Sequence, residues 1–102
     1  MTDPKPTTLA VDDTIRREYG DPAFWLRKAA FGDPQPAMPK ACHDCAVTCG
    51  LYTGFTLGLS LQPRDVQIEA SRRWWCHNAP DRACGGNIDL LGIRAELEAA
   101  DA

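Results

Sequence analysis

Apolar side chains recur every three or four residues in several short stretches, and helix start and stop signals bound these stretches. An aspartate at position 12 or 13 can cap a first helix, which ends before Gly20. Asp21 and Pro22 begin a second helix, whose apolar run stops before Gly32. These signals predict an N-terminal helical hairpin over residues 11–32.

The segment 46–61 allows two interpretations. Its leucines and phenylalanine alternate as in a strand, but apolar side chains also recur every four residues, as on one face of a helix. We predict a helix here, although each glycine in it costs about 1 kcal/mol in helix propensity. Gly50, Gly54 and Gly58 share the four-residue spacing and would form a smooth stripe that another helix can approach closely.

The remaining pattern predicts the domain organisation. Residues 1–10 have few large apolar groups and are expected to form a flexible lead-in, and the three prolines of residues 33–40 predict an extended linker. The cysteine-bearing half, 41–102, carries further helical patterns over 64–74 and 93–100. We therefore expect an all-α fold, a small metal-stabilised domain of four to five short helices with an irregular cysteine loop.

Composition narrows the class of protein. A chain of 102 residues buries only about 60–65% of its unfolded surface, so its core is thin. Fourteen acidic and eleven basic residues give a net charge of −3, which provides no overall positive field for nucleic acid or anionic lipid. The sequence shows no apolar stretch of membrane-spanning length and no secretory signal, and we expect a cytoplasmic protein without membrane contact.

Five cysteines are the unusual feature of the sequence. Disulfides are uncommon in a reducing compartment, where clustered cysteines more often hold a metal. Cys42 and Cys45 form a CxxC turn, whereas Cys76 and Cys84 flank a segment rich in turn residues. Glycines directly after Cys84 allow the backbone to pass close to a sulfur. The four cysteines therefore have the arrangement of a structural metal site.

The other candidate ligands leave alternatives open. Cys49 lies one helical turn beyond Cys45, so it either replaces Cys45 as a ligand or packs beneath the site. His43 and His77 each adjoin a cysteine, and one of them can complete a Cys₃His shell. Zinc is favoured by the two histidines and by its frequency in small structural sites. A [4Fe–4S] cluster is the alternative, favoured by the compact thiolate run and nearby glycine amides.

Residues 42–91 resemble small bacterial and phage proteins that carry a cysteine cluster. The resemblance rests on a CxxC, a helical stretch, an aromatic-Cys-His step and a final Cys-small-Gly, here Cys42/Cys45, Trp75-Cys76-His77 and Cys84-Gly85-Gly86. It implies metal binding by Cys42, Cys45, Cys76 and Cys84. It implies no activity.

The function expected from the sequence is a metal-stabilised binding or regulatory module that docks a protein partner, or else a nucleic acid. Arg72, Arg73 and Trp74 place cations beside an aromatic ring, a combination suited to partner contacts, whereas Trp75 is expected to cover the metal. A [4Fe–4S] redox or oxygen-sensing electron-transfer protein is the alternative. No catalytic motif appears in the sequence, and we predict that the protein is not an enzyme.

Overall fold

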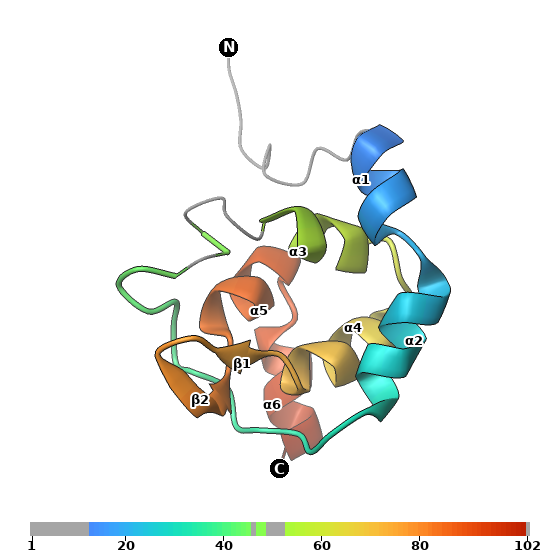
Figure 1. Ribbon diagram of the computed structural model, residues 1–102. Helices are drawn as coiled ribbons and strands as arrows, with labels where there is room; N and C mark the ends of the chain where they lie inside the picture. Colours follow the sequence, from blue (N-terminus) through green and yellow to red (C-terminus); the bar gives the residue numbers. More distant parts are fainter. Residues whose placement is uncertain (1–12, 46, 49–52, 102) are drawn as a thin grey trace.

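The computed structural model describes residues 13–45, 47–48 and 53–101 and is mainly helical (Figure 1). Within these residues the elements follow in the order α1 (Asp13–Tyr19), α2 (Pro22–Ala30), α3 (Thr53–Leu59), α4 (Arg64–Arg72), β1 (Trp75–Cys76), β2 (Ala79–Ala83), α5 (Gly85–Leu91) and α6 (Arg94–Asp101). None of the helices in this part of the chain has the length and apolar character needed to span a bilayer. The predicted lead-in, 1–10, lies outside the described residues.

Local signals set most helix boundaries as expected. The Asp21 side chain accepts a hydrogen bond of 3.0 Å from the Ala23 amide, and Pro22 is the first residue of α2. Gly32, just beyond that helix, has a positive φ of 86°. Pro63 precedes α4, as predicted. These boundaries depend on neighbouring residues alone, which is why the sequence reveals them.

The helix predicted over 46–61 is seen in part, because α3 covers only Thr53–Leu59, and residues 46 and 49–52 lie outside the described residues. Two members of the predicted glycine stripe, Gly54 and Gly58, lie on α3, whereas Gly50 is among the residues that are not described. A Cβ atom at Gly58 would clash with the backbone of Tyr19, and one at Gly54 would press on the Tyr19 ring. The small residues therefore let α1 pack directly on α3.

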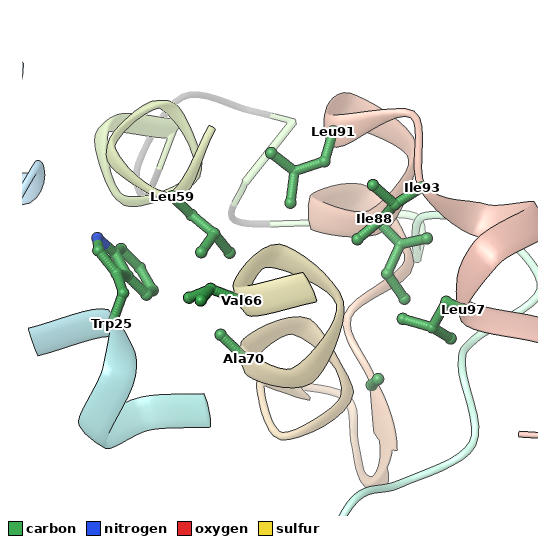
Figure 2. Packing of buried hydrophobic residues seen from close by; sticks show 9 residues of the cluster. Trp25, Leu59, Val66, Ala70, Ile88, Leu91, Ile93 and Leu97 are labelled. Atoms are coloured by element: carbon green, nitrogen blue, oxygen red, sulfur yellow. The ribbon is translucent and has the colours of Figure 1, made fainter. Parts of the chain in front are cut away.

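The core lies on both sides of α4. Figure 2 shows Val66 and Ala70 of α4 pointing toward Trp25 of α2, while aliphatic side chains from α5 and α6 fill the opposite side. The indole nitrogen of Trp25 donates to the backbone oxygen of Tyr19 over 2.6 Å, so its burial leaves no unsatisfied donor. The buried members of this cluster are Trp25, Leu59, Val66, Ala70, Ala83, Ile88, Leu91, Ile93 and Leu97.

A buried polar chain crosses the same region. Asn87 of α5 donates to the Ser71 hydroxyl over 2.8 Å and accepts from the Thr56 hydroxyl over 2.8 Å. All three side chains are fully buried. The asparagine thus links α3, α4 and α5 by bonds that only one arrangement of these helices satisfies.

The prediction of an all-α fold with four to five helices is wrong in two details. The described residues form six helices, and β1 and β2 form an antiparallel hairpin where an irregular loop was expected. The proline-rich segment is extended, as predicted, and runs beside this hairpin (Figure 1). Its backbone pairs with Ala83, which donates to the Pro36 oxygen over 2.8 Å and accepts from the Met38 amide over 3.0 Å. This pairing fixes the path of the chain between α2 and the CxxC turn.

The sequence analysis also missed α5, whose first residues are Gly85 and Gly86. Two glycines lower helix propensity by about 2 kcal/mol together, so local preference argues against a helix there. Ile88 and Leu91 of this helix are buried in the core. Burial in the folded protein therefore overrides the local preference.

We predict that Asn87→Ala lowers the free energy of unfolding by about 3 kcal/mol, because it removes a partner from two buried hydroxyls and leaves a small void. Urea denaturation followed by circular dichroism measures this loss. Asp81→Ala, at an exposed position of β2, is the control and should change stability by less than about 0.5 kcal/mol. Equal losses in the two variants would show that the polar chain contributes nothing.

Candidate metal centre

Three segments bring the described cysteines together. The CxxC forms a tight turn in which the Cys45 amide donates to the Cys42 oxygen over 3.2 Å. Cys76 ends β1 and pairs with Ala79, so the hairpin turn between them has only two residues. Cys84 directly precedes α5 and is tied to the hairpin by a 2.7 Å bond from its amide to the Trp74 oxygen. The fold therefore brings together cysteines that are up to 42 positions apart (84 − 42).

The four predicted ligands, Cys42, Cys45, Cys76 and Cys84, meet as two pairs of thiols. The sulfurs of Cys42 and Cys76 and a ring nitrogen of His77 all lie within 4.8 Å of one another. The Cys45 and Cys84 thiols hydrogen-bond each other and form a buried cluster with Val47. Cys42 packs against that cluster, so the two pairs are neighbours.

Backbone amides donate hydrogen bonds to three of the cysteine sulfurs. Cys42 faces the Asp44 amide, Cys45 faces the amides of Val47 and Thr48, and Cys84 faces those of Gly86 and Asn87. In each case the donors lie two or three residues after the cysteine. Such donors stabilise a negatively charged sulfur, so these turns are suited to hold thiolates as metal ligands.

The pKa values of these thiols reflect competing effects. Burial raises the pKa of Cys84 to about 11. The adjacent Cys45 raises this pKa further, whereas hydrogen bonds from the amides of Asn87 and Gly86 lower it. Burial also acts on Cys45, but hydrogen bonds from the Thr48 amide and hydroxyl and from the Val47 amide outweigh it and lower its pKa. Within this pair, Cys45 is therefore the first thiol to ionise.

The expected need for glycine beside the sulfurs is confirmed. A Cβ atom at Gly86 would clash with the sulfur of Cys45, and one at Gly85 would clash with the backbone oxygen of Lys40. Any larger residue would push α5 away from the CxxC turn. The two glycines that disfavour a helix locally are thus what allow Cys84 to approach Cys45.

Asp44 and Asn78 complete the surroundings of the site, and the sequence analysis missed both. One carboxylate oxygen of Asp44 lies 3.4 Å from Nε2 of His77 and accepts from the Asn78 side-chain amide. The Asn78 bond and then the His77 bond hold the pKa of Asp44 below its usual value. With Nε2 engaged by the carboxylate, Nδ1 of His77 is the nitrogen left for a metal. The position of Asp44 inside the CxxC was the available signal.

The two candidate histidines have different neighbours. His77 lies with the Cys42 and Cys76 sulfurs, although its side chain is 45% exposed. His43 is 87% exposed, and its Nε2 lies 3.6 Å from a carboxylate oxygen of Asp44. Cys49 lies outside the described residues.

The predicted partner-binding residues differ in their surroundings from what we expected. Arg72 and Arg73 are largely buried, with side chains 17% and 16% exposed, and both form ion pairs with Glu69. Trp75, expected to cover the metal, is 59% exposed, and this expectation is wrong. Trp74 packs against the Cys45 and Cys84 cluster instead. Trp74 precedes β1, whereas Trp75 is the first residue of this strand.

Comparisons with protein-family models, with curated proteins and with solved structures found no match for this chain. The geometry of the thiols and their surroundings therefore carries the functional argument.

The Glu69 ion pairs predict a pH dependence of stability. Hydrogen bonds from Arg73 and Arg72 hold the pKa of Glu69 below 4.5, its ordinary value. The stabilisation is therefore complete above about pH 4.5 and is lost as the pH falls through the lower pKa of the folded state. We predict that Glu69→Gln lowers the melting temperature at pH 7 and makes it less sensitive to acid between about pH 5 and 3.

Glu96→Gln is the comparison for this test. A hydrogen bond from Arg64 also lowers the pKa of Glu96, so this variant should respond to acid in the same direction, but by less, because both side chains of its ion pair are well exposed. Such exposed pairs contribute little to stability. Differential scanning calorimetry across the pH range compares the variants, and an equal response of the two would contradict a special role of Glu69.

Proposed function

We propose that this protein is a small module that is stabilised by a metal centre and docks a protein partner. The ligands in this proposal are the thiolates of Cys42, Cys45, Cys76 and Cys84. The observation that carries it is the convergence of two thiol pairs from three segments, with backbone amides directed at the sulfurs. A structural metal gains its stabilising effect by joining segments that the unfolded chain holds apart.

A thin hydrophobic core supports the same proposal. The main apolar cluster lies around α4, whereas Cys45, Val47 and Cys84 form a separate, smaller cluster near the CxxC turn. Even with the partly buried side chains that pack against it, namely Ala41, Cys42, Trp74 and Leu90, a cluster with three buried members excludes little water and contributes little stability. Metal coordination would supply the missing stabilisation.

The face of α2 is the proposed docking surface. One hollow of about 220 Å³ is lined by Phe24, Trp25, Lys28, Phe55 and Trp74. A second hollow, of about 490 Å³, is lined by Phe24, Arg27, Lys28, Ala30 and Phe31. Phe31 is 82% exposed, and Lys28 Nζ lies 6.0 Å from the centre of the exposed Trp75 ring. Among the described residues, aromatic groups and cations line these hollows and no carboxylate does, a combination suited to an acidic partner with apolar side chains.

Trp74 links this surface to the metal centre. Its ring lines the first hollow, stacks near Trp25 with 6.2 Å between ring centres, and packs against the Cys45 and Cys84 cluster. The predicted contact residue therefore retains a place in the proposed docking surface. The two arginines beside it do not, because both pair with Glu69 and Arg73 also donates to backbone oxygens.

We predict that the purified protein contains stoichiometric metal when iron and zinc are both supplied. Its removal should lower the melting temperature by on the order of 10 °C or more, since coordination joins three segments. Cys76→Ala and Cys84→Ala should each abolish stoichiometric binding, whereas Cys49→Ser should retain it. Elemental analysis and thermal scans measure both effects. An unchanged melting temperature after verified metal removal would contradict a structural role.

For the docking surface, we predict that Arg27→Glu weakens partner binding at least tenfold while metal content and melting temperature stay unchanged. Arg82→Glu makes the same charge change at an exposed position of β2 and should bind normally. A partner is first captured by crosslinking in the native host and then titrated as purified protein against each variant. Equal affinities for the two variants would rule out the α2 face. Salt-dependent binding to a single-stranded oligonucleotide, lost in Arg27→Glu, would indicate nucleic acid instead.

A further inference from the structure

The thiols of the candidate centre are grouped two and two. Each pair joins one cysteine of the CxxC turn to one cysteine of the C-terminal half, Cys42 with Cys76 and Cys45 with Cys84. Within each pair the side chains are close enough to hydrogen-bond. The two pairs are neighbours, because Cys42 packs against the cluster formed by Cys45, Val47 and Cys84.

A single zinc ion requires a different grouping. Zinc binds sulfur at about 2.3 Å in a tetrahedron, so any two of four thiolates on it stand about 3.8 Å apart. In this structure the group of ligand atoms within 4.8 Å of one another contains Cys42, Cys76 and His77, and it includes neither Cys45 nor Cys84. The four sulfurs are therefore spread wider than one ion needs.

The two common iron–sulfur clusters differ in how they group their ligands. In a [4Fe–4S] cluster each of four irons takes one thiolate, so no two ligand sulfurs share an iron. In a [2Fe–2S] cluster each iron takes two thiolates, which yields two close pairs side by side. The two thiol pairs of this protein match the ligand grouping of a [2Fe–2S] cluster.

We propose that the centre holds a [2Fe–2S] cluster, with Cys42 and Cys76 on one iron and Cys45 and Cys84 on the other. This rests on the proposed function, in which these four thiolates bind a metal. The cluster would give the module a one-electron redox step that zinc cannot supply. The amides directed at Cys42, Cys45 and Cys84 suit it, because hydrogen bonds to the sulfurs stabilise the charge of the bound cluster.

The surroundings of the two irons differ in this assignment. Cys45 and Cys84 are buried beside Trp74. Cys76 is buried as well, whereas Cys42 is partly exposed and His77, which follows Cys76, is exposed. His77 is assigned no bond to iron, because Cys42 and Cys76 already supply the two thiolates of the iron beside it. His77→Ala is therefore expected to retain the cluster. It should shift the midpoint potential of the cluster, because it removes a polar neighbour of the iron assigned to Cys42 and Cys76.

The test begins with protein purified without oxygen from cells supplied with iron and zinc. Iron, zinc and acid-labile sulfide are measured together, and we expect about two irons and two sulfides per chain and little zinc. Reduction with dithionite should then produce the electron paramagnetic resonance signal of one Fe²⁺/Fe³⁺ pair, and Mössbauer spectra should show two iron sites.

Other results separate the two proposals. One zinc per chain without sulfide, or four irons with four sulfides, would overturn the [2Fe–2S] assignment and leave the metal-stabilised module intact. Absence of every metal, with a melting temperature unaffected by added iron or zinc, would overturn both. Cys49→Ser is the matched control and should keep the full cluster.

The pairing has its own test, which does not depend on cluster assembly. Metal-free protein is treated with diamide, which accepts two electrons and two protons for each disulfide formed from two thiols. Mass spectrometry of its peptides should show Cys42 bonded to Cys76 and Cys45 bonded to Cys84. A Cys42–Cys45 disulfide as the main product would contradict the assignment of thiols to irons.

Discussion

The packing of α4 between two apolar layers is the constraint on which the rest of the structure depends. Val66 and Ala70 meet Trp25 on one side, and the aliphatic side chains of α5 and α6 close the other. Because α4 leads into β1, its position determines where the hairpin begins. The buried Asn87 bonds to Ser71 of α4 and so sets the position of α5 in the same frame. Both elements that carry the later cysteines are thus placed by this helix.

Placement of the CxxC turn requires a second set of contacts. The extended 33–40 segment pairs with Ala83, and Gly85 and Gly86 let the chain after it pass without a clash. The Arg94 side chain also donates to the Met38 oxygen over 2.7 Å, which ties this segment to α6. Main-chain pairing thus helps to place both the first and the later cysteines, since Cys76 pairs with Ala79 and the Cys84 amide donates to the Trp74 oxygen. In the proposed function, the metal joins these two parts.

The proposed docking surface and the proposed metal centre share Trp74. This side chain lies between the small cluster around Cys45 and the hollow on the α2 side. In the proposed function, the ring of Trp74 would connect a change at the thiols to the aromatic face. In this proposal a redox-active cluster and a docking surface form one functional unit.

The sequence by itself determined the features that depend on near neighbours. Asp21, Gly32 and Pro63 mark helix boundaries through caps and backbone conformations that their own segments define. The cysteine positions and the glycines after Cys84 likewise indicated a thiol-rich centre before any fold was known. Helical character and the candidate ligand set could therefore be predicted, although metal binding itself stays a prediction.

Only the tertiary structure decided the pairing of the thiols, the β-hairpin and α5. Spacing along the chain says that four sulfurs can meet, but the distances between them depend on contacts between residues up to about forty positions apart. The sequence likewise could not predict that Trp75 is exposed and that Arg72 and Arg73 are largely buried. Contacts with Glu69 and the position of the hairpin determine this. Glycine disfavours the start of α5 locally, and only the burial of Ile88 and Leu91 and the approach to Cys45 make that helix favourable.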